Sequence, residues 1–328
     1  MQALILAGGE GTRLRPLTYT VPKPVLPLAG RPHIAYVIDW LVRHGIDDVI
    51  ISCGHLAESV RRALAKLEAD VRIRYAEEPD ARGTAGAIRF AEEMLAERFF
   101  VLNGDILCDL DLSAQIEQHT RTGARGTLAL YPVSDPTGYG LIHRQDDGEI
   151  TEFLEKPEPH EIDTDEINAG AYLLERSVLD EIPPERAVSI EREVFPRLVG
   201  TGLYGIRLEG YWIDIGTPER YLEANWDILE ERVETATRVA DPAMVGADCE
   251  VSSSAELRAP CVVGPKSRIG SDALIDRSVL LESCVVEDGA RVVSSILSGG
   301  VTVERGAELE GAVIGEDERV AAEVGAAE

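Results

Sequence analysis

Glycines and an arginine close to the N-terminus are the first residues whose types and spacing could do chemistry. Glycine lets backbone amides approach a phosphate closely, and an arginine just beyond can neutralise the phosphate charge. The spacing fits neither a dinucleotide-binding GxGxxG, which would need a glycine at Leu14, nor a P-loop, which would end in Gly-Lys-Ser/Thr. The segment predicts a phosphate-binding turn, with an ordinary glycine-rich turn as the alternative. It reads Leu6, Ala7, Gly8, Gly9, Glu10, Gly11, Thr12, Arg13.

Two of the chain's four lysines directly precede a proline, whereas most of its 32 basic residues are arginines. Lys23 lies between Pro22 and Pro24, and Lys156 is followed by Pro157. Proline fixes its own φ and restricts the residue before it, so each lysine is a positive charge held in place. We expect both to contact phosphate groups, although solvated surface lysines would also fit.

Two aspartates have the surroundings of metal ligands. Asp105 follows an apolar strand-like run that ends at Asn103, and the carboxyl ends of such strands are where open α/β sheets bind ligands. Asp214 lies in an otherwise apolar segment, where a carboxylate is costly unless it is paired or bound to a metal. Two carboxylates plus substrate phosphate oxygens suit octahedral Mg²⁺. Each aspartate could instead cap a turn.

The elements that must position these residues alternate between apolar runs and amphipathic stretches up to about residue 208, as in an open, mostly parallel α/β sheet. Three closely spaced strands then predict an antiparallel extension, and Thr217 with Pro218 predicts the start of a helix that runs to about Val233. The predicted strands are 3–6, 49–53, 72–76, 99–103, 126–133, 140–144 and 149–153, and the predicted helices are 34–43, 57–67 and 84–96.

Beyond about residue 241, aliphatic residues recur with a period of six. Neither an α-helix nor a flat strand has this period, but a parallel β-helix does, because each short face turns one aliphatic side chain inward. Irregular loops with chance aliphatics are the alternative. The series is Val245, Val251, Leu257, Val263, Ile269, Ile275 and Leu281, and with one slip it continues through Val286, Val292, Leu297, Val303, Leu309, Ile314 and Val320.

Composition excludes several classes of protein. The chain has 328 residues and a net charge of −27, which would repel a nucleic-acid backbone. No apolar stretch approaches the roughly 18 residues of a membrane span, and Met1 leads directly into a strand without a signal peptide, so we expect a cytoplasmic protein. The scattered cysteines and histidines predict neither disulfides nor a zinc site.

Taken together, these blocks resemble the sugar-1-phosphate nucleotidylyltransferases. Residues 6–18 with 22–30 are similar to the signature of that family, and the later blocks 103–105, 155–157, 168–170 and 211–216 follow in the family's order. The resemblance implies a Rossmann-like, mixed and mostly parallel α/β nucleotidyltransferase domain over residues 1–235. A left-handed hexapeptide β-helix follows over residues 241–325.

The resemblance also implies a mechanism, an in-line attack by a sugar 1-phosphate on the α-phosphorus of a nucleoside triphosphate with Mg²⁺ as cofactor. The implied catalytic residues are Arg13, Lys23, Asp105 and Asp214, and the implied metal ligands are Asp105 and Asp214. The implied nucleotide-binding residues are Leu6, Ala7, Gly8, Gly9, Gly11, Thr12, Arg13, Lys23, Gly83, Thr84 and Asp105. Those implied to bind the sugar phosphate are Gly140, Glu155, Lys156, Asn168 and Asp214.

Within the family, residues 83–86, 189–196 and 210–221 are more similar to the mannose-1-phosphate guanylyltransferases than to the thymidylyl branch. GTP and mannose 1-phosphate are therefore the expected substrates, with a glucose-1-phosphate thymidylyl- or uridylyltransferase as the alternative. A catalytically silent regulatory homologue and a β-helix acyltransferase are further alternatives, although no histidine that could serve an acyltransferase follows His160. We also expect a homo-oligomer, and a β-helix that serves either assembly or allosteric control.

Overall fold

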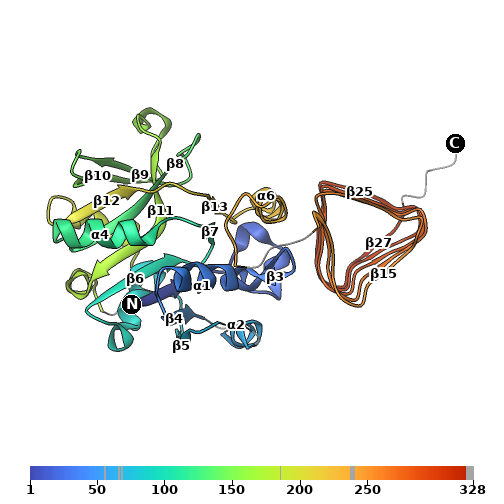
Figure 1. The fold of residues 1–328 in the computed structure, drawn as a ribbon, viewed down its shortest axis with the longest axis horizontal. Coiled ribbons are helices and arrows are strands. Elements are labelled where there is room, and N and C mark those ends of the chain that lie inside the picture. The colour runs from blue at the N-terminus through green and yellow to red at the C-terminus, as the bar shows by residue number, and fades with distance from the viewer. Residues whose placement is uncertain (55–56, 66, 68, 185, 237–240, 323–328) are drawn as a thin grey trace. The chain divides into compact units, whose positions relative to one another are not determined.

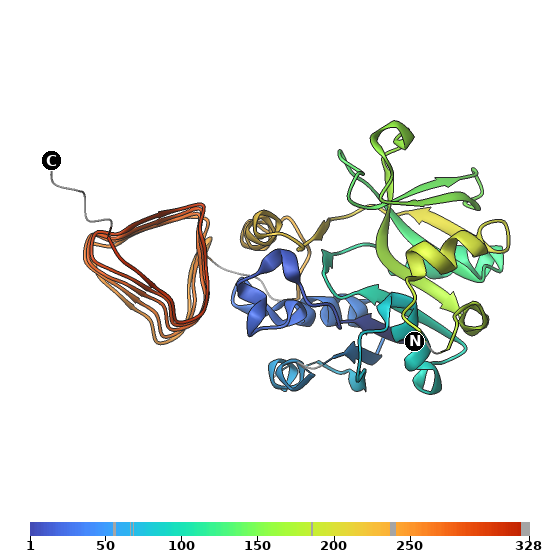
Figure 2. The ribbon, with the colours of Figure 1, turned by 180° about the vertical axis from the view of Figure 1, so that it is seen from behind.

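The computed structural model contains two compact units. One comprises Met1–Gly9 and Tyr36–Trp212, and the other comprises Glu10–Ala35 with the chain from Ile213 onward. The structure describes residues 1–54, 57–65, 67, 69–184, 186–236 and 241–322. Figure 1 and, from behind, Figure 2 show the elements of both units as ribbons. Within these described ranges, no helix has both the length and the apolar character to cross a membrane.

A mixed β-sheet forms the centre of the first unit, in the order β10-β9-β11-β6-β1-β4-β5, with β8 pairing to β11 and β12 pairing to β8. Strands β6, β1, β4 and β5 run parallel, and β11 runs antiparallel to β6. The predicted α/β sheet with an antiparallel extension is confirmed. The strands are β1 (Gln2–Leu6), β4 (Asp48–Cys53), β5 (Arg72–Glu77), β6 (Arg98–Asn103), β8 (Gly126–Pro132), β9 (Gly140–Arg144), β10 (Ile150–Glu155), β11 (Glu166–Glu175) and β12 (Leu203–Arg207).

The helices of this part of the chain are α1 (His33–Arg43), α2 (Ala57–Leu64), α3 (Gly83–Phe90), α4 (Leu112–Thr122) and α5 (Phe195–Leu198). The predicted helix 84–96 ends early, and a separate 3₁₀ turn, Glu92–Met94, follows it. The chain leaves the helix at Ala91 because Leu95 must reach the core before β6 begins. The predicted helix 57–67 stops at Leu64, and residue 66 lies outside the described residues.

Helix α4 and strand β11 were missed by the sequence prediction. Helix α4 has clear end signals, since the Asp111 carboxylate accepts hydrogen bonds from the amides of Ser113 and Ala114 and Gly123 ends it at φ 62°. Strand β11 is buried along nearly its whole length, yet it contains Asn168 and Gly170. It therefore shows neither an alternating nor a purely apolar pattern.

Aromatic packing ties β11 to the segment around α5. Tyr172 and Phe195 are both fully buried, and their rings meet edge to face with centroids 4.9 Å apart. Phe153 of β10 also contacts Phe195, at 5.5 Å. These contacts belong to the main core, which includes Phe99 and Val101 of β6. The segment that precedes α5 is thereby fixed against the strands that carry the sugar-side residues.

In the second unit, α6 (Pro218–Leu229) supports the segment that follows Lys23. The Thr217 hydroxyl accepts a hydrogen bond from the Arg220 amide, which confirms the predicted helix start, although the helix ends at Leu229 rather than near Val233. Asn225 accepts a hydrogen bond from the Ala29 amide at 2.8 Å, and the buried Tyr221 hydroxyl donates to the Pro27 carbonyl. The supported segment contains the short strands β2 (Pro27–Leu28) and β3 (Arg31–Pro32).

Three parallel sheets form the β-helix of the second unit, and Figure 1 shows its triangular cross-section. Ten of the fourteen predicted inward residues belong to its core, three of them partly buried, as expected for the predicted left-handed hexapeptide fold. Residues 323–325, where the predicted second domain ended, lie outside the described residues. The strands are β14 (Ala243–Val245), β15 (Glu250–Val251), β16 (Glu256–Arg258), β17 (Cys261–Val263), β18 (Arg268–Ile269), β19 (Leu274–Asp276), β20 (Val279–Leu280), β21 (Val285–Val286), β22 (Arg291–Val293), β23 (Ile296–Leu297), β24 (Thr302–Val303), β25 (Glu308–Glu310), β26 (Val313–Ile314) and β27 (Arg319–Val320).

Leu281 was wrongly placed in the predicted series, and Val245, Val251 and Val320, in the first and last coils, are not part of the core. Leu280, not Leu281, points into the core, because each coil after the first is one residue shorter at this corner. The turn is tightened by Arg277 at φ 43°, and the Ser278 hydroxyl donates to the Asp276 carbonyl at 2.8 Å. The same hydroxyl accepts a hydrogen bond from the Ser295 amide of the next coil. The shortened corner is therefore repeated from coil to coil.

Two valines at one register position of the β-helix allow a matched test of its core. Val286 is 1% exposed and Val251, which stands on the same ladder in the first coil, is 37% exposed. We expect Val286→Ala to cost about 1.5–3 kcal/mol through lost burial and a cavity, and Val251→Ala to cost less than about 1 kcal/mol. Amide hydrogen exchange of the coils in the full chain measures both. Equal costs would contradict the assigned core.

Candidate functional site

The carboxyl ends of β1 and β6 meet at one edge of the first unit's sheet. Leu6 pairs with Asn103, and the Gly104 amide donates a hydrogen bond to the Leu6 carbonyl at 3.0 Å. A side chain at Gly104 would collide with that carbonyl. Glycine at this position therefore lets the chain pass close to β1, and Asp105 follows at the same edge as the glycines after Leu6, as predicted.

Gly8 and Gly9 are exposed at this edge. A Cβ atom added at Gly9 would meet nothing within 4 Å, and one at Gly8 would lie 3.7 Å from Glu78 Oε1. Packing therefore does not require glycine at either position, and the exposed backbone there leaves room for a ligand to approach closely. The Glu78 carboxylate accepts a hydrogen bond from the Ser52 hydroxyl at 2.5 Å, and burial raises the pKa of Glu78.

The other half of the glycine-rich turn belongs to the second unit. Gly11 has φ 62°, and a Cβ atom there would lie 2.9 Å from the Thr18 side chain. The Thr18 hydroxyl donates to the Gly11 carbonyl at 2.8 Å, and Thr12 begins a short 3₁₀ turn. Lys23 lies beside this turn and is only 9% exposed. The lysine is thus held by the fold rather than free in solvent, as its prolines predicted.

Arg13 and Asp214, both predicted site residues, come together within the second unit. A Cβ atom at Gly216 would lie 2.6 Å from the Arg13 guanidinium and would also collide with the Asp214 carboxylate. The Gly216 amide donates a hydrogen bond to Asp214 Oδ1 at 2.8 Å. Glycine is therefore required at 216 so that the arginine and the aspartate can lie side by side.

Four of the five residues predicted to bind the sugar phosphate lie on or next to β9, β10 and β11 of the first unit, and the fifth, Asp214, lies in the second unit. Gly140 pairs with Glu155, and a Cβ atom at Gly140 would lie 3.0 Å from the Glu155 carboxylate and 2.8 Å from the Phe153 ring. Lys156 follows at φ 56°, with its amide bonded to the Tyr139 carbonyl. Strand β11 joins this group where Ile167 pairs with Leu141 of β9, next to Asn168.

The Asn168 side chain is held on both sides. Its Oδ1 accepts a hydrogen bond from the Gly170 amide and its Nδ2 donates to the Tyr172 hydroxyl, each at 3.0 Å. Gly170 has φ 76°, and a Cβ atom there would press against Asn103 of β6. The Oδ1 of Asn103 is buried and has no hydrogen-bond partner among the described residues.

Gly83 and Thr84, predicted to lie near the base, begin α3 and are bonded to the segment before α5. Gly83 has φ 68°, and a Cβ atom there would lie 2.6 Å from the Val188 carbonyl. That carbonyl accepts hydrogen bonds from the amides of Ala85 and Gly86. Residues 83–86 and 189–196, noted separately for their resemblance to the guanylyl branch, therefore adjoin in the structure.

Glu191, Ser189 and Tyr172 were not predicted as site residues. The Thr84 hydroxyl donates to Glu191 Oε2 at 2.7 Å, and the Ser189 hydroxyl donates to the same oxygen at the same distance. Glu191 lies in a π-helical turn, Ile190–Val194, a conformation frequent at functional sites. The motif around Glu191 was visible in the sequence, but nothing there indicated its contact with Thr84.

Burial, and then the negative charge of Glu191, raise the pKa of the Glu155 carboxyl, while Lys156 and Arg192 oppose the rise. The Glu155 carboxylate, which lies next to Gly140, is therefore within reach of the Glu191 charge. Carboxylates in this arrangement can accept hydrogen bonds from the hydroxyl groups of a sugar.

The predicted site residues are divided between the two units. The first unit holds Leu6, Ala7, Gly8, Gly9, Gly83, Thr84, Asp105, Gly140, Glu155, Lys156 and Asn168, and the second holds Gly11, Thr12, Arg13, Lys23 and Asp214. The structure brings members of each set together within their own unit. The pairing of Asp105 with Asp214 around a metal ion stays a prediction.

The donor set fits the predicted magnesium ion, which prefers one or two carboxylates together with substrate phosphate oxygens. In the part of the chain that the structure describes, no group of three or more histidine, cysteine, aspartate or glutamate side chains is arranged to hold a metal.

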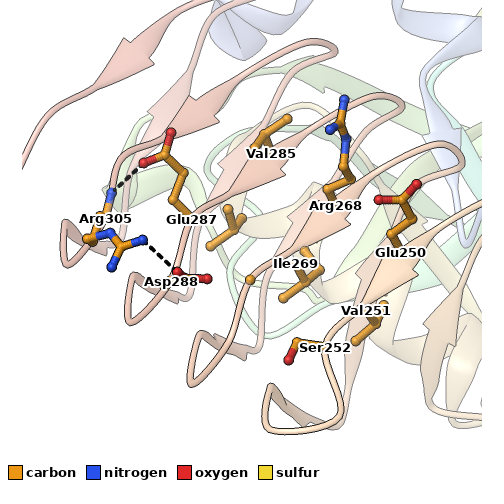
Figure 3. A pocket seen from close by; sticks show the side chains of 11 residues that line it. Glu250, Val251, Ser252, Arg268, Ile269, Val285, Glu287, Asp288 and Arg305 are labelled. Atoms are coloured by element: carbon orange, nitrogen blue, oxygen red, sulfur yellow. Dashed lines mark hydrogen bonds and ion pairs between the residues drawn. The ribbon is translucent and has the colours of Figure 1, made fainter.

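A groove of about 470 Å³ on the outside of the β-helix contains none of the predicted site residues (Figure 3). It is open and lined by aliphatic and charged side chains of β15, β18 and β21. Arg305 closes one end, with its side chain 2.7 Å from Asp288 and its amide 3.0 Å from Glu287. The groove belongs to the surface of the repeat and not to the predicted site.

Family models match nearly the whole chain. Residues 2–231 match the model described as nucleotidyl transferase, and residues 239–327 match the model described as GMPPB C-terminal domain.

Three relatives match this chain over most of their own length. The chain is 35% identical to mannose-1-phosphate guanylyltransferase 1 of Arabidopsis thaliana and 36% identical to a mannose-1-phosphate guanyltransferase of Emericella nidulans, each over 99% of this chain and 93% of the relative. It is 30% identical to a UTP–glucose-1-phosphate uridylyltransferase of Synechocystis, over 93% of this chain and 89% of that protein.

A solved structure of HddC from Yersinia pseudotuberculosis complexed with GMP-PN is similar over 68% of this chain and 97% of that one, with a TM-score of 0.59 and 29% identity. Since the family model alone spans residues 2–231, this chain belongs to the nucleotidyl transferase family.

Proposed function

We propose that this protein joins GTP to mannose 1-phosphate, giving GDP-mannose and pyrophosphate. The observation that carries the proposal is the extent of the similarity to mannose-1-phosphate guanylyltransferases of a plant and a fungus, which covers 99% of this chain and includes the β-helix. The local geometry supports it, because residues 83–86 and 189–196, which resemble the guanylyl branch, form one hydrogen-bonded substructure.

In the proposed reaction, an oxygen of the sugar phosphate attacks the α-phosphorus of GTP. The bond from that phosphorus to the oxygen bridging to the β-phosphate breaks, and pyrophosphate leaves with the electron pair. No covalent enzyme intermediate is needed, so catalysis rests on positioning and on neutralising charge.

The proposed reaction assigns roles to the residues predicted to bind the triphosphate. The amides of Gly8, Gly9 and Gly11 would bind phosphate oxygens, and Arg13 would stabilise the leaving pyrophosphate. Lys23, restrained by its prolines and by burial, would contact phosphate in the transition state. Asp105 and Asp214 would hold Mg²⁺, whose chemistry there is to neutralise phosphate oxygens as negative charge develops. The remaining nucleotide contacts would come from Leu6, Ala7, Thr12, Gly83 and Thr84.

On the sugar side, Lys156 would bind the sugar phosphate, while Glu155 and Asn168 would accept or donate hydrogen bonds to the sugar hydroxyls. Glycine is needed at 140 because a side chain there would press against the Glu155 carboxylate and leave no room for the sugar. We assign this chemistry to a nucleotidyltransferase domain at residues 1–235, and the β-helix at 241–325 to assembly.

The homo-oligomer and the cytoplasmic location stay predictions. Strands β14, β15 and β16 are terminal in their sheets, and the apolar Val245 and Val251 beside them are 43% and 37% exposed, which supports assembly through the β-helix. A uridylyltransferase acting on glucose 1-phosphate is the second candidate, favoured by the similarity to the Synechocystis protein. A silent regulatory homologue would release no pyrophosphate with any substrate.

A substrate grid tests the proposal. GTP, dTTP, UTP, ATP and CTP are each combined with mannose, glucose and N-acetylglucosamine 1-phosphates in the presence of Mg²⁺, and pyrophosphate release is measured. We expect kcat/KM for GTP with mannose 1-phosphate to exceed every other pair by at least about 10-fold. A preference for UTP or dTTP with glucose 1-phosphate would replace the assignment by the second candidate.

Asp105→Asn tests the metal assignment. The change keeps the shape of the side chain but removes its charge, and we expect kcat to fall by at least about 100-fold. Asp111→Asn is the matched control, because asparagine caps a helix as well as aspartate does, and its rate should stay within about 2-fold. An Asp105→Asn variant that keeps most of its rate would refute the role.

A further inference from the structure

Glu191 lies at the centre of a hydrogen-bond network within the first unit. Its Oε2 accepts from the hydroxyls of Thr84 and Ser189, both at 2.7 Å, and its Oε1 accepts from the Tyr172 hydroxyl at 3.4 Å. Among the described residues Glu191 forms no ion pair, so hydroxyl donors from α3, β11 and its own turn surround the carboxylate. A partly buried charge is tolerated in such a place only when its partners are fixed.

The Tyr172 hydroxyl carries the network to the sugar side. This side chain is fully buried, and its oxygen accepts from Asn168 Nδ2 at 3.0 Å and from Asn103 Nδ2 at 3.5 Å while it donates to Glu191. All the hydrogen-bonding capacity of a phenol is then used. The Gly170 amide fixes which end of the Asn168 side chain faces Tyr172. The direction of the Tyr172 proton, and with it the acceptor face offered to Asn168, depends on Glu191.

Thr84 carries the network to the nucleotide side. Its hydroxyl accepts a hydrogen bond from the Ile190 amide at 2.8 Å and donates its own proton to Glu191. The first turn of α3 is therefore locked to the π-helical turn by a side chain, in addition to the backbone bonds to Val188. A displacement of α3 would be transmitted directly to the Glu191 carboxylate.

We propose that Glu191 is a positioning residue of the sugar-phosphate subsite, which orients Asn168 through Tyr172 and links that orientation to the nucleotide side through Thr84. The inference rests on the proposed function, because that function assigns Asn168 and Glu155 to the sugar. It adds Glu191, Tyr172 and the Thr84 hydroxyl as determinants of how well the sugar phosphate is held.

The pH dependence of sugar binding tests whether the Glu191 charge acts on Glu155. Burial raises the pKa of Glu155, and the Glu191 charge raises it further, against Lys156 and Arg192. A protonated Glu155 is a poorer acceptor for sugar hydroxyls, so sugar binding should weaken as the pH falls. Glu191→Gln removes one cause of the raised pKa, and the acidic limb of the pH profile should move to lower pH. This shift reports that the two carboxylates interact, and the KM values of the variants test the positioning role.

Steady-state kinetics of full-length Thr84→Val, Tyr172→Phe and Glu191→Gln test the proposal. We expect each to raise the KM for mannose 1-phosphate by about 10-fold, the size of one lost hydrogen bond in a charged network. Tyr172→Phe and Glu191→Gln, at residues with no assigned nucleotide contact, should raise the KM for GTP by less than about 3-fold. Because the residues act as one unit, Tyr172→Phe combined with Glu191→Gln should lose no more than the worse single change. Thr127→Val is the matched control, since it removes a buried hydroxyl bonded to His119 and should leave both KM values unchanged.

Unchanged KM for the sugar phosphate in all three variants, an equal rise in both KM values for Tyr172→Phe or Glu191→Gln, or multiplied effects in the double variant would overturn the inference. Failure of the proposed function would look different. If the wild type prefers another substrate pair, the same comparison is made with that sugar phosphate. If the wild type shows no turnover, calorimetric binding of each sugar 1-phosphate replaces KM, and equal affinity in wild type and variants then overturns the inference.

Discussion

The parallel pairing of β1 with its neighbours β6 and β4 is the constraint on which the first unit depends. Parallel strands place their carboxyl ends on one edge of a sheet, and Leu6 and Asn103 end their strands in register. Gly104 then passes against the Leu6 carbonyl, where no side chain would fit. Gly8, Gly9 and Asp105 follow these strands at one edge of the sheet because of this register, and a shift of one residue in either strand would separate them.

The sugar side is built from a different part of the same sheet. Gly140 and Glu155 face each other across an antiparallel pair, and β11 brings Asn168 beside them. The buried Tyr172 and Phe195 hold β11 against the segment that carries Glu191. Positioning in this region comes from backbone pairing and aromatic packing, and the polar groups are then set by short hydrogen bonds between hydroxyls and carboxylates.

Much of this arrangement could be read from the sequence where signals are local. The strand ends, the Thr217 cap and the six-residue period depend on neighbouring residues, and the structure confirmed them. Strand β11 was missed because its polar residues and Gly170 break the apolar pattern. Leu281 was misplaced because the five-residue step at the shortened turn was set after it and not before it.

The contact between Thr84 and Glu191 joins residues far apart in the chain, and no local pattern reports it. The spacing of residues in the sequence could indicate which of them carry the chemistry, but only the structure shows which of them are in contact.

The product that receives the α-phosphorus of GTP tests the proposed nucleotidyl-transfer mechanism most directly. Incubation with Mg²⁺, mannose 1-phosphate and GTP labelled at the α-phosphate should place the label in GDP-mannose, and GTP labelled at the γ-phosphate should give labelled pyrophosphate. If the γ-label appeared in inorganic phosphate or on the sugar, with the α-label in GDP, attack would occur at another phosphorus. The nucleotidyl-transfer mechanism would then be wrong for this protein.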